Sequence, residues 1–385
     1  MFERHQGGDR VVLASIDTGQ PDYRESLEEL HQLATSAGLT VAGVVEGRRA
    51  RPDPTYFAGS GKVEEIGAAV HAHEADLVIF NHPLSPAQER NLERALECRV
   101  VDRTTLILDI FARRAKSAEG ILQVELAQLA HLATRLVRGW SHLERQKGGI
   151  GLRGPGETQL ETDRRQIGKR VKLLRDRLAR VQRQHKVQRR ARSRRQVMSV
   201  SLVGYTNAGK STLFNRLTHA NSYVANQLFA TLDTTTRQLF LPETGEIVLS
   251  DTVGFITGLP HTLVESFHAT LEETREADLL LHVVDSVSPM RDRHIAEVNH
   301  VLGEIGADAI PQILIYNKID LGPGSPGIER DEYGRISAIR LSAQTGEGIS
   351  LLRTALGEAR QDFLRSGSTS ENARTTNSEY HPELD

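Results

Sequence analysis

The stretch VMSVSLVGYTNAGKSTLFNRLTHA, residues 197–220, decides the fold of the second half of the chain. It opens with an apolar run, passes through a glycine-containing loop and ends in a helical pattern. The loop fits G-x-x-x-x-G-K-S, with Gly204, Gly209, Lys210 and Ser211 at the fixed positions. A strand, this loop and a helix in that order predict a phosphate-binding site, where backbone N–H groups and the helix N-terminus hold the phosphates.

Each loop residue has an expected role in that site. We expect Lys210 to neutralise the β- and γ-phosphate oxygens during catalysis, and the Ser211 hydroxyl to bind Mg²⁺. Asn207 allows two interpretations: its carbonyl ligates a monovalent cation such as K⁺ and so assists catalysis, or its side chain stabilises the loop turn. The nucleotide contacts predicted here are Gly204, Tyr205, Thr206, Asn207, Ala208, Gly209, Lys210 and Ser211.

Three later motifs each follow an apolar strand pattern, as ligand-binding residues do in α/β proteins. Asp251 is placed to support the Mg²⁺ shell, and the backbone of Gly254 to reach the γ-phosphate. Asp320 can accept hydrogen bonds from N1–H and the 2-amino group of guanine, which adenine lacks. The predicted contacts are Asp251, Thr252, Val253, Gly254, Asn317, Lys318, Ile319, Asp320, Ser342, Ala343 and Gln344. Together they favour GTP and GDP over ATP.

A threonine-rich segment, FATLDTTTR, lies between the loop and Asp251. We expect Thr231 to complete the Mg²⁺ shell, with Thr234 or Thr235 as the alternatives. The neighbouring nucleotide contacts predicted in this segment are Phe229, Ala230, Leu232 and Asp233. Phe255 follows Gly254 where Ras-type switches carry a water-orienting glutamine. Its ring cannot bind water, so we expect slow hydrolysis until a partner completes the site.

The N-terminal region, residues 1–114, alternates short apolar runs with helical patterns. VVLASI, TVAGVV and DLVIF are typical of buried strands, which predicts a small α/β domain with a largely parallel sheet. The local sequence Gly59-Ser-Gly-Lys62 resembles a phosphate loop but lacks its spacing and the Ser or Thr after lysine. The first turn of a helix is the simpler interpretation.

Residues 115–196 show two leucine-rich seams with alternating spacings of four and three, one from Leu122 to Leu143 and one from Ile167 to Val181. The glycine-rich stretch GGIGLRGPGETQLE, residues 148–161, interrupts them and predicts an antiparallel coiled-coil hairpin. From Arg164 to Arg195 the chain has fifteen Lys or Arg and one acidic residue. An RNA partner is therefore favoured over a merely solvated face. The predicted RNA contacts are Arg145, Lys147, Arg153, Gly154, Arg164 and Arg165.

The bulk composition is that of a globular protein. The 385 residues carry a formal net charge of −2 and one cysteine, Cys98. No apolar run reaches the length of a membrane span, so we expect a cytoplasmic protein, and a monomer. The remaining expected regions are a GTPase domain with a mostly parallel sheet over residues 197–365 and a disordered tail over residues 366–385.

The motifs GYTNAGKS, FATLDTTTR, DTVGFI, NKID and SAQTG resemble those of the translation-factor class of GTPases. The stretch starting VVDRTTLILDIFARR at Val100, followed by GGIGLRGPGETQLETDRR, resembles the HflX-type ribosome-associated GTPases. That resemblance implies binding to the 50S ribosomal subunit and its rRNA, with residues 148–157 reaching the peptidyl-transferase region. It further implies GTP-dependent splitting of stalled or idle 70S ribosomes, release on hydrolysis, and ATP binding by the N-terminal domain. A ribosome assembly factor and an RNA-remodelling GTPase remain the alternatives.

Overall fold

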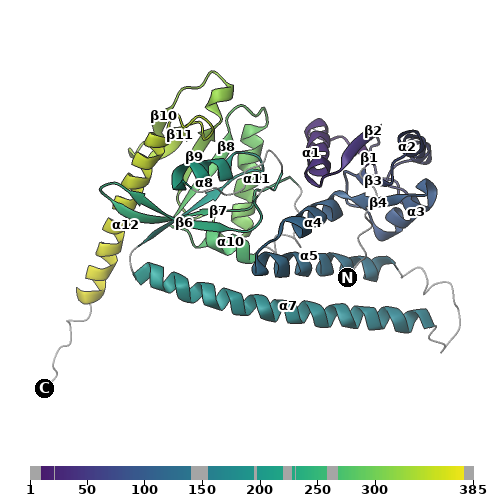
Figure 1. Cartoon of the computed structure of the whole chain (residues 1–385), viewed down its shortest axis with the longest axis horizontal. Coiled ribbons are helices and arrows are strands. Elements are labelled where there is room, and N and C mark those ends of the chain that lie inside the picture. Colours follow the sequence, from purple (N-terminus) through teal and green to yellow (C-terminus); the bar gives the residue numbers. More distant parts are fainter. Residues whose placement is uncertain are drawn as a thin grey trace. The chain divides into compact units, whose positions relative to one another are not determined.

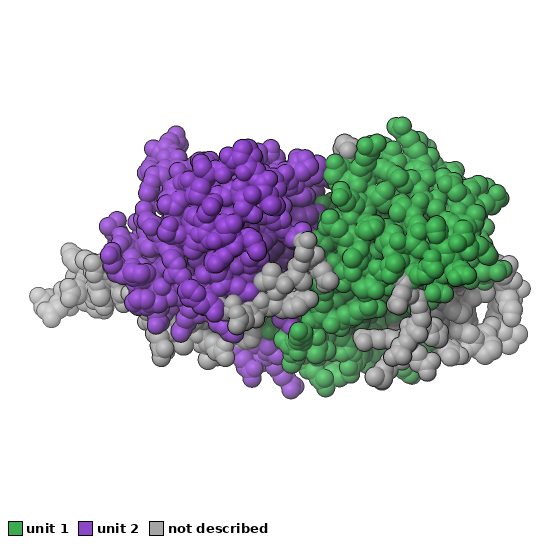
Figure 2. All heavy atoms as spheres, turned by 45° about the horizontal axis from the view of Figure 1, so that its top comes forward, with its two compact units in different colours: residues 1–179, 227–229, 257–267 green, residues 180–226, 230–256, 268–385 purple. Residues whose placement is uncertain are grey.

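The computed structural model describes residues 10–20, 22–139, 155–194, 197–219, 228–229, 231–257 and 268–376. Two compact units divide the chain (Figure 2). Unit 1 comprises residues 1–179, 227–229 and 257–267, and unit 2 comprises residues 180–226, 230–256 and 268–385.

Unit 1 is built on a four-stranded sheet in which every strand pairing is parallel, in the order β2-β1-β3-β4 (Figure 1). The strands are β1 (Arg10–Asp17), β2 (Thr40–Arg48), β3 (Leu77–Phe80) and β4 (Arg99–Asp102). The helices are α1 (Tyr23–Ser36), α2 (Ser60–His73), α3 (Pro86–Leu96) and α4 (Arg103–Arg114). The apolar side chains of β1 and those of Val78, Ile79 and Phe80 in β3 are buried, as expected for strands with helices on both faces. The predicted N-terminal α/β domain is confirmed.

Two long helices, α5 (Ala118–Gly139) and α7 (Pro155–Arg194), carry the leucine seams. Leu126, Leu174 and Leu178 form a buried cluster, and a contact from Arg170 Nη2 to Glu125 Oε1 at 2.7 Å joins the helices beside it. Leu122, Leu129 and Val171 pack against the cluster. The seams therefore meet, as their spacing predicts.

The start of α7 differs from the sequence-based expectation. The helix begins at Pro155, within the stretch 148–161 that was expected to interrupt the helices. Proline at the first helical position loses no hydrogen bond and has a helical φ, which explains why a helix can start there. Residues 140–154 lie outside the described residues, and with them the predicted RNA contacts Arg145, Lys147, Arg153 and Gly154.

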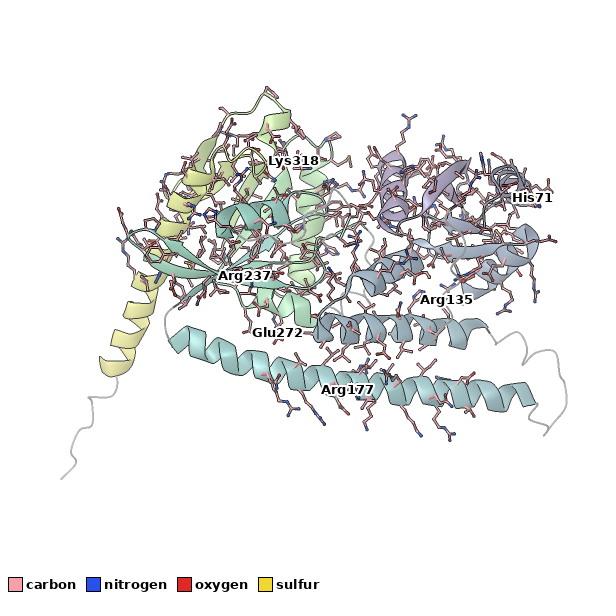
Figure 3. All side chains as sticks on the ribbon, in the orientation of Figure 1. His71, Arg135, Arg177, Arg237, Glu272 and Lys318 are labelled. Atoms are coloured by element: carbon pink, nitrogen blue, oxygen red, sulfur yellow. The ribbon has the colours of Figure 1, made fainter. Side chains whose placement is uncertain are left out.

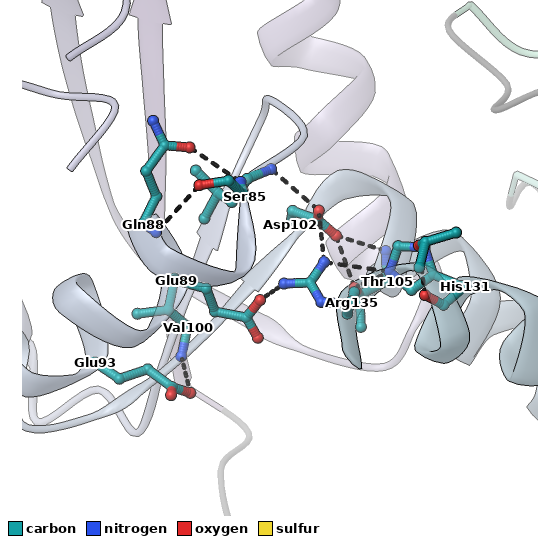
Figure 4. Close-up of polar contacts among 11 residues, drawn as sticks. Ser85, Gln88, Glu89, Glu93, Val100, Asp102, Thr105, His131 and Arg135 are labelled. Atoms are coloured by element: carbon teal, nitrogen blue, oxygen red, sulfur yellow. Dashed lines mark hydrogen bonds and ion pairs between the residues drawn. The ribbon is translucent and has the colours of Figure 1, made fainter. Parts of the chain in front are cut away.

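A partly buried ionic cluster joins α5 to the carboxyl edge of the unit 1 sheet (Figure 4). Arg135 of α5 pairs with Glu89 of α3, and its Nη1 lies 3.3 Å from Asp102 Oδ2 at the end of β4. Asp102 also caps α4, because its Oδ1 accepts from the backbone N–H of Thr105 at 2.8 Å. The Asp102 carboxylate thus joins the sheet edge, α4 and α5.

Unit 2 contains a seven-stranded sheet in the order β10-β11-β9-β8-β5-β7-β6 (Figure 1). The strands are β5 (Met198–Val203), β6 (Thr235–Leu241), β7 (Gly245–Asp251), β8 (Leu279–Asp285), β9 (Gln312–Asn317), β10 (Gly327–Arg330) and β11 (Ile336–Arg340). The helices are α8 (Lys210–Thr218), α10 (His268–Arg275), α11 (Arg291–Glu304) and α12 (Ile349–Thr376). Strands β5, β7, β8, β9 and β11 are parallel, and β6 and β10 pair antiparallel at the edges. The mostly parallel sheet predicted for this region is confirmed.

The C-terminal boundary also differs from the expectation. Helix α12 runs to Thr376, beyond Ser366, where the disordered tail was expected to begin. Extending an existing helix needs no new nucleation, so a polar sequence can continue it. Residues 377–385 lie outside the described residues. Across the described ranges, no helix combines the length and apolarity that crossing a membrane requires.

Candidate nucleotide-binding site

The loop between β5 and α8 requires glycine at two positions. Gly204 and Gly209 have φ of 147° and 95°, in the region that other residues rarely adopt. A Cβ on Gly209 would lie 2.2 Å from Asn317 Nδ2, and one on Gly204 would lie 2.2 Å from the carbonyl oxygen of Val283. The loop can therefore approach β8 and β9 only with glycine at these positions.

Lys210, the first residue of α8, folds back over this loop. Its Nζ donates to the carbonyl oxygens of Gly204 at 2.9 Å and Tyr205 at 2.8 Å. Burial lowers the pKa of Lys210 to about 8, partly opposed by the charge of Asp251. The ammonium group is held in the position where the motif predicts that it meets phosphate.

Three oxygen-bearing side chains converge beside Lys210. Ser211 Oγ donates to Asp251 Oδ2 at 2.6 Å, and Thr231 Oγ1 lies 2.6 Å from Ser211 Oγ and 3.1 Å from the same carboxylate oxygen. Burial raises the pKa of Asp251, although the hydroxyl of Ser211 and the charge of Lys210 oppose this. The other carboxylate oxygen, Oδ1, is buried without a hydrogen-bond partner among the described residues.

These groups fit a hard cation such as Mg²⁺. Hydroxyl and carboxylate oxygens are its preferred ligands, and it usually keeps water and substrate phosphates as the remaining ones. In the described ranges no cluster of three His, Cys, Asp or Glu could hold a metal ion. Thr231, rather than Thr234 or Thr235, lies at this position.

Asn317, at the end of β9, connects the phosphate loop to the expected base-binding loops. Its Nδ2 donates to the carbonyl of Ala208 at 2.8 Å, and its Oδ1 accepts from the backbone N–H of Ala343 at 2.9 Å. Lys318, labelled in Figure 3, donates to Asp285 Oδ2 at 2.6 Å. Asp320 lies in a short 3-10 turn and is exposed, open to an incoming base. Asn317, Lys318 and Asp320 belong to unit 2, as do Lys210, Ser211, Thr231 and Asp251.

The segment after Asp251 pairs with the phosphate loop, which the sequence did not indicate. The N–H of Thr206 donates to the Phe255 carbonyl at 2.8 Å, and the N–H of Phe255 donates to the Gly204 carbonyl at 3.2 Å. The Phe255 side chain is buried. An apolar group at this position offers no hydrogen bond to an attacking water, as the sequence predicts.

Other predicted site residues have different surroundings. Phe229 packs edge-on against Phe111, with 4.6 Å between ring centroids, and both belong to unit 1. Thr252 donates to the Leu202 carbonyl at 2.6 Å, inside the sheet. Asn207 is exposed with φ of 60°, which leaves both of its interpretations open. Ala230 lies outside the described residues.

The loop that begins at Ser342 is held by an arginine of α8. Arg216 of α8 donates through Nε to the Ala343 carbonyl at 3.2 Å and also donates to the carbonyl of Gln344. These hydrogen bonds hold the loop that begins at Ser342 against α8. Among the predicted nucleotide contacts, the apolar side chains of Leu232, Val253 and Ile319 are buried.

The predicted RNA contacts Arg164 and Arg165 are exposed on α7.

Comparison with known proteins gives matches along most of the chain. Residues 24–112 match the family described as GTP-binding GTPase N-terminal, residues 114–192 the GTP-binding GTPase Middle Region, and residues 199–318 the 50S ribosome-binding GTPase family. A GTPase HflX of Escherichia coli (strain K12) is 57% identical over 371 residues, covering 95% of this chain and 87% of the relative. A GTPase HflX of Magnetococcus marinus is 48% identical, covering 93% and 85%. A crystal structure of the protein SsGBP with GDP is similar in fold, with a TM-score of 0.50 and 24% identity over 92% of this chain and 99% of that one.

Proposed function

The chain belongs to the HflX family of GTPases and hydrolyses GTP, and from this premise we propose that its GTP-bound form binds the 50S ribosomal subunit and splits stalled or idle 70S ribosomes. Hydrolysis of the bound GTP would then permit release of the protein from the 50S subunit. The observation that carries the proposal is the combination, in one chain, of the converging site around Lys210 with a long helix whose outer face is basic.

Each residue of the site would have a separate role in phosphoryl transfer. This reaction depends on positioning and charge stabilisation more than on covalent catalysis. Lys210 is placed to exchange its two loop carbonyls for phosphate oxygens. Ser211 and Thr231 would hold Mg²⁺ together with the phosphates, and Asp251 would support the Mg²⁺ shell through water. The ion would supply charge neutralisation there. Asp320 would select guanine, while Asn317 keeps base and phosphate loops at a fixed separation.

The helix α7 supports an RNA partner because its two faces differ in chemistry. Leu174 and Leu178 are buried against α5, whereas Lys172, Arg175 and Arg177 are exposed. Figure 3 labels Arg177, which projects from the helix. Arginine and lysine on one accessible face suit the phosphate backbone of rRNA.

Sedimentation of 70S ribosomes with the protein and a non-hydrolysable GTP analogue tests the proposal. We expect loss of the 70S peak with wild type and much less loss with the double variant Lys172→Gln, Arg175→Gln. The double variant Arg237→Gln, Arg335→Gln, which removes two exposed charges from unit 2, is the matched control and should act as wild type. An unchanged 70S peak with bound protein would instead favour an assembly factor.

The cation dependence of hydrolysis tests the finer roles of the site. We propose that Mg²⁺ is required and that Asn207 ligates K⁺ beside the phosphates. Faster hydrolysis in K⁺ than in Na⁺, with the difference lost in Asn207→Ala, is the expected result. Equal rates in the two salts would assign Asn207 to the loop turn.

A further inference from the structure

An aromatic contact on the phosphate loop is not part of any motif discussed above. The imidazole of His294 stacks on the ring of Tyr205, with centroids 3.8 Å apart and planes within 11° of parallel. Tyr205 is the second residue of the loop and is largely buried. His294 lies in the first turns of α11, where its N–H donates to the Met290 carbonyl at 2.9 Å. Both residues belong to unit 2.

Tyr205 lies at the junction of three parts of the site. Its carbonyl accepts from Lys210 Nζ at 2.8 Å, and its backbone forms a parallel bridge with Phe255. The hydrogen bonds on either side of that bridge join Gly204 and Thr206 to the segment after Gly254. A side-chain contact that holds Tyr205 therefore acts on the loop that carries the phosphates.

We propose that His294 is a positioning residue for nucleotide binding: its ring, stacked on Tyr205, holds the phosphate loop in its binding conformation. The helix that presents His294 directly follows β8, whose last residue, Asp285, pairs with Lys318 of the base loop at 2.6 Å. The stack thus connects α11 to the phosphate loop, and the strand before α11 ends at a residue that pairs with the base loop.

The environment of His294 suits a neutral stacking ring. Burial lowers its pKa from the ordinary value, Asp285 opposes that shift and Arg293 adds to it. Burial thus favours the uncharged ring, which can lie flat on Tyr205 without desolvating a charge. A flat apolar ring of similar size should replace it.

The stack touches no reacting atom, so its loss should weaken substrate and product binding alike and leave the chemical step unchanged. Parallel aromatic pairs contribute enough for about a twofold to tenfold change in affinity. We expect His294→Ala to raise KM for GTP and Kd for GDP by about that factor, with kcat within about twofold of wild type.

Four variants make the test specific to the stack. His294→Phe keeps a flat ring and should restore KM and Kd. His300→Ala changes a histidine of the same helix that is 71% exposed and pairs with Glu304, and should match wild type. In a Tyr205→Leu background, His294→Ala should have no further effect, because the stacking partner is already gone.

Steady-state GTPase kinetics and GDP titration on the full-length variants decide the outcome. Higher KM and Kd in His294→Ala, restored in His294→Phe, support the proposal. Unchanged KM, a fall in kcat at unchanged KM, or equal losses in His294→Ala and His294→Phe would each overturn it. Because only nucleotide and protein are present, a negative result leaves the ribosome proposal untouched.

Discussion

Two Gly-Lys sequences each lie at the start of a helix that follows a strand, one in each unit, and their local structures differ. In unit 1, Gly59 has φ of −76°, helix α2 begins at Ser60, and Lys62 Nζ donates to the Glu46 carbonyl at 2.8 Å and to Glu65 at 2.5 Å. In unit 2, Gly209 has φ of 95° and Lys210 is buried over its own loop.

The difference shows what converts a glycine and a lysine into a phosphate site. In unit 2 the left-handed glycine lets the loop turn back, so that lysine is surrounded by carbonyls it can exchange for phosphate oxygens. In unit 1 the backbone of Gly59 has a negative φ that any residue can adopt, and Lys62 pairs with Glu65 on its own helix. The arrangement around Gly59 agrees with the interpretation as a plain helix start.

Replacing each lysine by alanine should give the largest difference between the two sequences. Lys210→Ala deletes a charged donor from a water-poor site, and we expect kcat/KM for GTP to fall by roughly a hundredfold to a thousandfold. Lys62→Ala removes a partly exposed pair and should leave GTPase kinetics unchanged. Steady-state rates of the two variants are the measurement, and equal losses would contradict the distinction drawn between the two sequences.

Alanine at the glycine directly before each lysine, Gly209 and Gly61, should give the next largest effect. In Gly209→Ala the new Cβ meets Asn317 Nδ2 at 2.2 Å on a backbone of positive φ. The left-handed conformation alone costs about 1–2 kcal/mol, and with the clash we expect affinity for GDP to fall at least tenfold. Gly61→Ala meets open space on a helix and should leave it unchanged. Titration with a fluorescent GDP analogue measures both, and unchanged affinity in Gly209→Ala would show that the loop does not need glycine there.

The pH dependence of binding should give the smallest effect. The pKa of Lys210 is lowered to about 8 in the free protein, and bound phosphates would raise it, so binding takes up a proton above that pH. Affinity is therefore fully present below about pH 8 and falls by up to about tenfold per unit above it. Lys210→Arg, which keeps its charge, should bind without this dependence, whereas Lys62→Ala should retain it. A flat profile in wild type would show that Lys210 stays charged without nucleotide.

The sequence predicts those features of the fold and the site that depend on residues close together in the chain. The turn at Gly204–Gly209, the strand ends at Asp251 and Asn317, and the leucine seams depend on nearby residues, and each was predicted from spacing. The start of α7 at Pro155 and the extension of α12 to Thr376 were not predicted, because propensity at a helix end is weak compared with the helix already formed.

Contacts between residues distant in sequence leave no periodic pattern in the sequence. The stacking of His294 on Tyr205 and the packing of Phe229 on Phe111 join residues 89 and 118 positions apart, by the difference of their numbers. No periodicity marks either pair, since each depends on where tertiary packing places a single ring. Lys62 illustrates the reverse: a sequence suggestive of a phosphate loop folds as an ordinary helix turn.

Competition between GDP and ADP measures whether the site around Lys210 selects guanine nucleotides. We expect wild type to bind labelled GDP at one site, unlabelled GDP but not ADP to displace it from there, and Lys210→Ala to lose it. Displacement of labelled GDP by ADP at similar concentrations, or guanine binding that survives Lys210→Ala, would contradict a guanine-selective site at this loop.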